Sequence, residues 1–259
     1  MHIPVLLEEV LNILDLREGD FAVDGTVDGG GHAEAMLEHV GKSGKLLGVD
    51  LDENILSGTR ERFKENKNFI LARGSYADLP EIIKARKLPL ADGLLLDLGF
   101  SSEQLVSGRG FSFEKDEPLL MTYDESARSA KEWLKRLREG ELADIIYKFG
   151  EERFSRRIAK AIKQSRNIET SKDLAEIIRS AVPGSYERGR INPATRTFQA
   201  LRIFVNNELE NLEKVLSELG VIVATGGRVA IISFHSLEDR IVKESFKFMK
   251  KNEVGEILT

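Results

Sequence analysis

The fold of this chain is decided by the stretch Phe21-Ala22-Val23-Asp24-Gly25-Thr26-Val27-Asp28-Gly29-Gly30-Gly31-His32. Its apolar beginning predicts a strand over Phe21–Val27, and the glycines lead into a helix that we expect to begin near Ala33. A strand, a glycine turn and a helix in this order form the nucleotide-binding unit of doubly wound α/β sheets, because glycines let a ligand approach the backbone and the helix offers free N–H groups. Three successive glycines are also typical of a plain flexible loop, so the rest of the sequence must decide.

Four further apolar segments fit the strands of a parallel sheet. They are Lys45–Asp50, Asn68–Ala72, Gly93–Leu98 and Arg228–Phe234, and helical patterns separate the earlier ones. Gly93–Leu98 is apolar on both faces, as expected for a central parallel strand. Alternating strands and helices therefore predict an α/β fold, a Rossmann-like doubly wound sheet.

Between the fourth and fifth predicted strands the sequence is helical. A long loop over Phe100–Asp124 precedes several amphipathic helices, and a last helix from about Ala194 to Leu219 is expected to return to the sheet. We therefore predict a discontinuous Rossmann-like domain and an inserted all-helical domain. Their ranges are 1–104 with 201–259 for the first, and 105–200 for the second.

Composition narrows the possible function classes. The 259 residues include no cysteine, which excludes disulfides, thiolate metal sites and a cysteine nucleophile. No segment predicts a membrane span, and Met1–Pro4 lacks the basic start of a signal peptide, so we expect a cytoplasmic protein with no membrane partner. The segment Glu256–Thr259 resembles the start of another strand, from which we expect a further C-terminal piece.

The net charge of −5 is unevenly distributed. Residues 128–202 hold eighteen Lys and Arg against ten Asp and Glu, whereas the rest of the chain holds twenty against thirty-three. This asymmetry predicts that the middle of the chain faces a polyanion, with Arg156, Arg157 and Lys160 on the surface concerned. The alternative is a set of helices with ordinary solvated basic faces.

Polar side chains are expected to gather where the parallel strands end, because ligands of open α/β sheets bind beyond the carboxyl ends of the strands. Asp50 follows Gly30 by twenty residues, the separation at which an acidic residue meets a ribose hydroxyl pair; a solvated or helix-capping carboxylate is the alternative. His32 either donates to a ligand or caps a helix, and Tyr76 either lies against an adenine or packs at the sheet edge. The four histidines lack metal-ligand spacing, so no metal site is predicted.

A set of motifs spans nearly the whole chain. Its segments are His2–Leu7, Asp24–Thr26, Gly30–His32, Leu95–Gly99 with Ser101, Ser102 and Gln104, Arg109–Phe113, Gly150–Phe154, Pro193–Ala200 and Ile232–Arg240. The set resembles the bacterial 16S ribosomal RNA cytosine-N4 methyltransferases, the MraW-like family. The resemblance implies S-adenosylmethionine as the cofactor, held by Gly30, Gly31, His32, Asp50, Tyr76, Asp97 and Gln104. It also implies a helical insertion for 16S ribosomal RNA of the small ribosomal subunit, in which a cytidine is methylated at N4.

Methyl transfer to an exocyclic amine needs positioning and an acceptor for the amine protons. Asp97 and the carbonyl of Leu98 stand at the strand end expected for this acceptor, and Phe100 can stack on a base splayed out of the RNA. Asp97 is thus predicted to be catalytic, although the resemblance assigns it to the cofactor. Further substrate contacts are expected at Arg109, Arg196, His235 and Ser236, whereas the pattern from Ser236 to Asp239 also fits a plain helix cap.

The sequence departs from the family pattern at a few positions. Asp28 stands where a glycine is expected and adds a negative charge to the turn, and Leu120 and Thr122 replace charged residues. Two other functions stay open on the same fold. One is a nicotinamide-dependent oxidoreductase, although the turn is not Gly-x-Gly-x-x-Gly; the other is a non-catalytic RNA-binding scaffold. A monomer and a homodimer are equally open.

Overall fold

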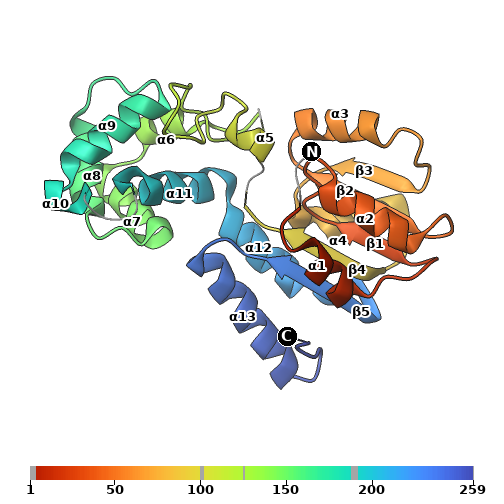
Figure 1. The fold of residues 1–259 in the computed structure, drawn as a ribbon. Coiled ribbons are helices and arrows are strands. Elements are labelled where there is room, and N and C mark those ends of the chain that lie inside the picture. Colours follow the sequence, from red (N-terminus) through yellow and green to blue (C-terminus); the bar gives the residue numbers. More distant parts are fainter. Residues whose placement is uncertain (1–3, 100–101, 125, 188–191, 259) are drawn as a thin grey trace. The chain divides into compact units, whose positions relative to one another are not determined.

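The structure is a computed structural model that describes residues 4–99, 102–124, 126–187 and 192–258 (Figure 1). The chain divides into two compact units. Unit 1 consists of Met1–Gly99 with Leu209–Thr259, and unit 2 of Phe100–Glu208. Each unit has its own hydrophobic core. Among the helices of the described residues, none is long and apolar enough to cross a membrane.

Unit 1 is built on a sheet whose described strands are all parallel, in the order β3-β2-β1-β4-β5 (Figure 1). The strands are β1 (Phe21–Asp24), β2 (Lys45–Asp50), β3 (Phe69–Arg73), β4 (Ala91–Asp97) and β5 (Val223–Ile232). The predicted α/β fold with a Rossmann-like sheet is therefore confirmed. The strand order reverses between β1 and β4, which is where such sheets bind their ligands.

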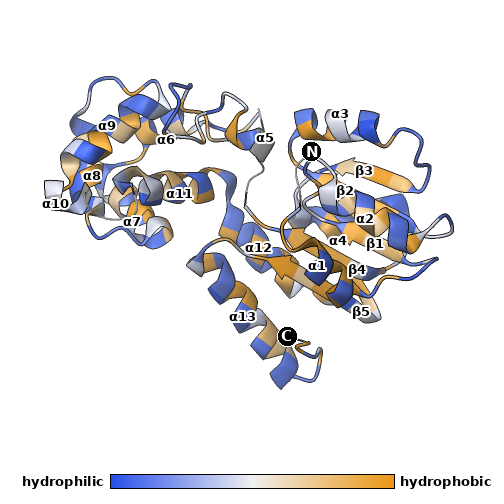
Figure 2. Cartoon of the chain, viewed as in Figure 1, coloured by the Kyte–Doolittle hydropathy of each residue, from blue (hydrophilic) through white to orange (hydrophobic). Residues whose placement is uncertain are grey.

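Helices cover both faces of the sheet, because successive side chains of each strand enter different apolar clusters. In β1, Phe21 and Val23 belong to one cluster and Ala22 to the other. The first cluster includes residues of α4 (Leu79–Arg86), α12 (Glu208–Ser217) and α13 (Ser236–Lys251), and the second those of α1 (Leu7–Leu14), α2 (Gly31–Val40) and α3 (Glu53–Arg62). Figure 2 shows the result as hydrophobic strands between helices with mixed faces.

Unit 2 is helical throughout its described secondary structure, apart from one bridge between Pro118 and Thr170. Its helices are α5 (Ser102–Leu105), α6 (Ala130–Arg136), α7 (Glu139–Gly150), α8 (Ser155–Gln164), α9 (Ser171–Ala181), α10 (Gly184–Glu187) and α11 (Pro193–Asn206). Fully buried Leu142 and Ile146 of α7 and Ile158 of α8 belong to its core. This core is separate from the two clusters of unit 1.

Three local predictions are wrong. The helix expected over Ala194–Leu219 is two helices, because Asn207 takes a left-handed φ of +52° and ends α11. The cap of α13 is His235 rather than Ser236, since His235 Nδ1 accepts a hydrogen bond from Glu238 N at 3.3 Å. Residues 256–258 form no strand, because they pair with no other strand in the described part of the chain.

Candidate functional site

The turn after β1 is held at the carboxyl ends of the central strands by hydrogen bonds. Gly25 N donates to Leu95 O of β4 at 2.9 Å, and Asp97 N donates to the Thr26 hydroxyl at 2.7 Å. A glycine is required at position 25, because a Cβ there would lie 2.5 Å from the side chain of Leu96. The turn is therefore part of the sheet edge rather than a loose loop.

Gly30 and Gly31 place the start of α2 against this turn. Gly30 precedes α2 with a φ of +80°, and a Cβ on it would lie 2.5 Å from the Phe63 ring. A Cβ on Gly31 would lie 2.7 Å from Pro4. Because Gly30 has no side chain, it offers no acceptor to the first N–H groups of α2, as a ligand-binding helix start requires.

Four carboxyl groups meet at this edge: Asp24, Asp28, Asp50 and Asp97. Burial raises the pKa of Asp24 to about 8 and the pKa values of Asp50 and Asp97 to about 7. Burial is the largest cause for all three pKa values, and repulsion by neighbouring carboxylates, including Asp28, adds to it. A cationic ligand would offset both the cost of burying the carboxylates and their mutual repulsion, so this edge favours positive charge.

Asp50 is fixed at the end of β2 by two backbone donors. Asp28 N donates to Asp50 Oδ2 at 3.2 Å, and Asp52 N donates to Asp50 Oδ1 at 2.9 Å. The cap of α3 is Asp52, whose Oδ1 accepts from Asn54 N at 3.1 Å. Asp50 is therefore not a helix cap, and its carboxylate is held in place at the carboxyl edge of the sheet.

His32 lies in the first turn of α2, between the N-terminal segment and Asp97. Its Nε2 is 2.9 Å from Val5 O and its Nδ1 is 3.6 Å from Asp97 Oδ2, and the residue is only 7% exposed. Since a carbonyl only accepts hydrogen bonds, Nε2 carries a proton and His32 does not cap a helix. The contact between His32 Nδ1 and Asp97 Oδ2 is then favourable if one of the two atoms carries a proton.

Asp97 offers its second oxygen to the site. Asp97 Oδ1 is buried and has no hydrogen-bond partner among the described residues. A buried carboxylate oxygen without a donor is costly, so a donor from a ligand would stabilise it. Of the predicted residues, Asp97 has the geometry most suited to receiving a proton.

Two aromatic residues lie at the same edge of unit 1. Tyr76 begins the 3-10 turn η1 (Tyr76–Asp78), is half-buried, and lies beside Gly25, whose added Cβ would be 3.2 Å from Tyr76 Cβ. Phe234 follows β5, is 57% exposed, and its ring would lie 3.4 Å from a Cβ on Gly99. The predicted strand Arg228–Phe234 included Phe234, whereas β5 ends at Ile232 and leaves Phe234 beyond the strand. Phe100, the predicted stacking residue, lies outside the described residues.

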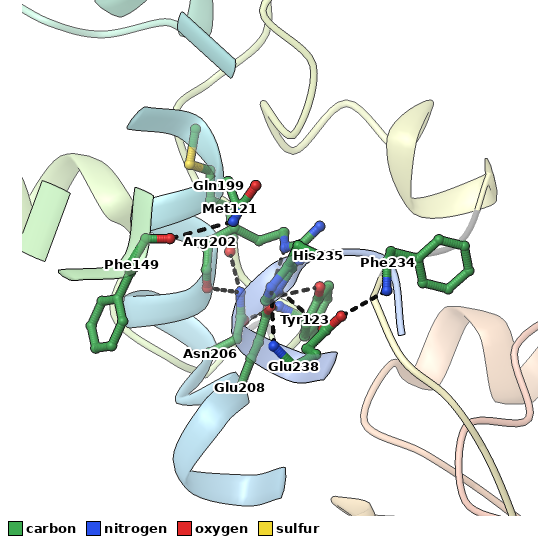
Figure 3. A network of polar contacts seen from close by, with 10 residues as sticks. All are labelled: Met121, Tyr123, Phe149, Gln199, Arg202, Asn206, Glu208, Phe234, His235 and Glu238. Atoms are coloured by element: carbon green, nitrogen blue, oxygen red, sulfur yellow. Dashed lines mark hydrogen bonds and ion pairs between the residues drawn. The ribbon is translucent and has the colours of Figure 1, made fainter. Parts of the chain in front are cut away.

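The segment after β5 is organised by Glu238, which sequence reasoning missed. Glu238 is 3% exposed, and its Oε2 accepts from Phe234 N at 2.9 Å (Figure 3). His235 Nε2 lies 3.2 Å from Glu238 Oε1. The predicted substrate contacts His235 and Ser236 thus occupy the cap and the first residue of α13, where Glu238 fixes the backbone that carries the exposed ring of Phe234.

In unit 2, Arg109 holds its own loop. Its guanidinium Nη1 donates to Thr122 O and Tyr123 O, both at 3.3 Å, and its Cζ lies 5.7 Å from the centre of the Phe111 ring. The rings of Phe111 and Tyr123 stack at 5.4 Å. Arg109 therefore shapes the loop after α5, a role that its motif did not predict.

A buried ion pair ties this loop to the end of α11 (Figure 3). Arg202 donates to both oxygens of Glu208 at 2.9 Å, and Glu208 also accepts from the Tyr123 hydroxyl at 3.0 Å. Asn206 Nδ2 donates to Met121 O at 2.9 Å. The side chains of Arg202 and Glu208 are only 11% and 9% exposed. Each charge is therefore shielded from water and needs the other as its counter-ion.

The structure brings six of the predicted cofactor residues to one edge of unit 1: Gly30, Gly31, His32, Asp50, Tyr76 and Asp97. Gln104, which is 7% exposed, belongs to unit 2. Arg196 also belongs to unit 2, where its Nη1 donates to Glu151 O at 3.1 Å.

Comparisons with a family model and with individual proteins both find similarity over nearly the whole chain. Residues 1–258 match the model of the MraW methylase family. The chain is 46% identical over 256 residues to ribosomal RNA small subunit methyltransferase H of Syntrophus aciditrophicus, covering 96% of this chain and 81% of that one. It is 44% identical over 257 residues to the protein of that name from Syntrophobacter fumaroxidans, covering 97% and 81%. A solved structure, Aeropyrum pernix fibrillarin with bound S-adenosyl-L-methionine, is 21% identical with a TM-score of 0.32, covering 40% of this chain and 46% of that one.

Proposed function

The chain belongs to the MraW methylase family, and on that basis we propose that it transfers a methyl group from S-adenosylmethionine to the N4 amine of a cytidine in 16S ribosomal RNA. The observation that carries the proposal is the carboxylate-lined edge of unit 1, where a buried Asp97 oxygen has no hydrogen-bond partner among the described residues. The names of the curated relatives support RNA of the small subunit as substrate. The choice of cytidine N4 follows from the motif resemblance.

The residues at the sheet edge fit the cofactor. When bound, S-adenosylmethionine supplies an activated methyl group on a positively charged sulfonium. Gly30 and Gly31 would let a ligand approach the backbone at the start of α2, and the Asp50 carboxylate would accept hydrogen bonds from the ribose hydroxyls. The cluster of carboxyls with raised pKa values complements the positive charge. Gln104 stays a cofactor contact that the motif alone predicts.

Asp97 is assigned the role of accepting the proton that the cytosine amine loses. The lone pair of a cytosine amine is conjugated into the ring, and a carboxylate oxygen bonded to an amine N–H localises it for attack. Formation of the N–C bond, with loss of the bond between the methyl carbon and the sulfonium, would leave a neutral thioether and a positively charged amine, and Asp97 Oδ1 would accept one of the amine protons. His32, fixed by Val5 O and placed 3.6 Å from Asp97 Oδ2, orients the carboxylate for this step.

The same charges argue against a nicotinamide dinucleotide. Its diphosphate would bring negative charge to a turn that carries Asp28 and borders Asp24 and Asp50. A non-catalytic RNA-binding scaffold would need no such cluster. Calorimetry with S-adenosylhomocysteine and with NADH separates these functions: we expect binding of the first ligand only.

The product of the reaction tests the proposal directly. The chain has no cysteine, so it cannot use a thiolate to activate ring carbon five of a pyrimidine. Unmethylated small ribosomal subunits are incubated with labelled S-adenosylmethionine, and the RNA is digested to nucleosides. We expect label in N4-methylcytidine. Label in 5-methylcytidine would contradict the mechanism, and label in N6-methyladenosine would contradict the substrate.

A further inference from the structure

Helix α8 presents a row of cations. Arg153 precedes the helix, and Arg156, Arg157 and Lys160 follow at helical spacing; all four are exposed, and we call them the Arg153 face. No carboxylate among the described residues forms an ion pair with any of them. Some other cations of unit 2 do form ion pairs, among them Lys131–Glu169, Arg138–Glu141 and Arg202–Glu208.

Arg153 is held in place without a carboxylate. Its Cζ lies 4.8 Å from the centre of the Phe154 ring and 5.0 Å from that of Tyr186. The two rings pack edge to face at 5.0 Å. A guanidinium that rests on aromatic rings keeps its N–H groups for a ligand, and little side-chain freedom is lost when the ligand binds.

The two rings are themselves anchored by Glu152. This residue is fully buried, and its Oε2 accepts from the Tyr186 hydroxyl at 2.7 Å, while its Oε1 accepts from Phe154 N at 2.7 Å. Arg157 adds a second guanidinium, with Cζ 5.9 Å from the Phe154 ring. The buried carboxylate of Glu152 is therefore used to hold the rings rather than to neutralise the arginines.

The position of the arginines is unfavourable for α8 itself. The first turn of a helix carries a partial positive charge, and α8 has no acidic residue in that turn, where Arg156 and Arg157 lie. Cations at this end repel the helix dipole and each other. An external anion would relieve that repulsion, which gives the Arg153 face an electrostatic reason to bind one.

We propose that the Arg153 face binds the phosphate backbone of the RNA substrate, and this rests on the ribosomal RNA methylation proposed above. Guanidinium groups bind phosphate oxygens in pairs and lysine binds them as a point charge, and neither contact carries sequence information. The Arg153 face is therefore a positioning surface that recognises RNA through its charge and leaves the choice of base to the sheet edge.

The test uses the full chain and two short single-stranded RNAs of unrelated sequence. Arg156→Glu should weaken binding of both RNAs about tenfold, the usual loss for a hydrogen bond to a charged group, and should lower the salt slope by about 1. The same substitution should raise the Tm by about 1 to 3 °C, because it places an acid in the first turn of α8. A purely structural role would give the opposite change in Tm.

Matched variants control for charge and packing. Arg138→Glu makes the same charge change at an exposed but paired residue of unit 2, and should leave RNA affinity unchanged. Arg153→Met keeps apolar contact with the rings but removes the guanidinium, and should weaken RNA binding as Arg156→Glu does. Equal losses in Arg138→Glu and Arg156→Glu, or no loss in both Arg153→Met and Arg156→Glu, would overturn the proposal.

Two further measurements identify the polyanion and separate RNA binding from methylation. If polyglutamate displaces the labelled RNA as well as unlabelled RNA does, the face serves an acidic protein partner and the proposal is wrong. Methylation of small ribosomal subunits by the parent chain is measured in parallel. Absence of methylation with RNA binding that still depends on Arg156 would contradict the proposed function alone, whereas methylation with RNA binding independent of Arg156 would contradict the Arg153 face alone.

Discussion

The carboxyl edge of the sheet in unit 1 and the Arg153 face of unit 2 carry opposite charges, yet neither region neutralises its own. The first gathers carboxyls whose pKa values burial has raised, and the second gathers cations without carboxylate partners among the described residues. Arg202 and Glu208 differ from both, because they neutralise each other within unit 2. The comparison teaches that charges paired internally satisfy each other within the fold, whereas clusters of one sign indicate a ligand of the opposite sign.

The largest effect is expected from Asp97→Asn. The amide keeps the shape of the side chain but cannot accept the proton of the amine, so the methyl-transfer rate should fall about 100-fold or more. Single-turnover transfer with saturating RNA and S-adenosylmethionine measures it. Asp144→Asn, at an exposed position of α7, serves as the control and should keep the parent rate. A rate near that of the parent for Asp97→Asn would remove Asp97 from the catalytic step.

Arg202→Met tests the paired charges. Removing the guanidinium leaves Glu208 buried without its counter-ion, and we expect a loss of about 3–5 kcal/mol in the free energy of unfolding. Urea denaturation followed by circular dichroism measures the loss. Arg138→Met breaks an exposed pair and should change stability little. If both variants are equally stable, the Arg202–Glu208 pair is no more important than a surface contact.

The two units also differ in how much of their structure the sequence could predict. β1, β2 and β4 are buried on both faces, so their apolar runs predicted strands. Asp50 and Asp97 were singled out because they stand near the ends of these strands, and Asp50 also because it follows Gly30 by twenty residues. The pair Arg202–Glu208 was not readable, because it depends on Asn207 turning the chain between α11 and α12.

Side-chain contacts that depend on tertiary structure could not be predicted either. The cap that His235 Nδ1 provides for α13 was not predicted, and neither was the stacking of Arg153 on Tyr186, a residue more than thirty positions away. Periodicity gives elements and the faces they bury. It does not give side-chain pairs that only tertiary packing brings together.

Asp50→Ala is expected to have a moderate effect on the cofactor. Loss of the carboxylate leaves the ribose hydroxyls without their acceptor, so S-adenosylmethionine binding should weaken by about 1–3 kcal/mol. Calorimetry measures the affinity, and Glu53→Ala, at an exposed neighbour in α3, provides the control. Unchanged affinity in Asp50→Ala would make this residue an ordinary strand-end carboxylate.

The smallest effect concerns pH, and its sign follows from the raised pKa values. Asp50 and Asp97 titrate with a pKa of about 7 and Asp24 with a pKa of about 8 in the folded chain, against about 4 for an unfolded aspartate. Between about pH 4 and 8 the folded chain therefore binds more protons than the unfolded chain. The contribution of these groups to stability falls as the pH rises through that window, so the Tm of the ligand-free protein should fall from pH 6 to 8 on their account.

Ligand binding should show the opposite trend. S-adenosylmethionine carries a sulfonium charge that S-adenosylhomocysteine lacks, and this charge favours the ionised carboxylates of the cluster. As the pH rises from 6 to 8 the carboxyls lose their protons, so the ratio of the two affinities should shift several-fold toward S-adenosylmethionine. Calorimetry with both ligands at matched ionic strength measures the ratio, and Asp97→Asn should reduce its pH dependence. A ratio that stays constant or falls would mean that the carboxyl cluster of unit 1 does not face the sulfonium, and the charge comparison would then hold for the Arg153 face only.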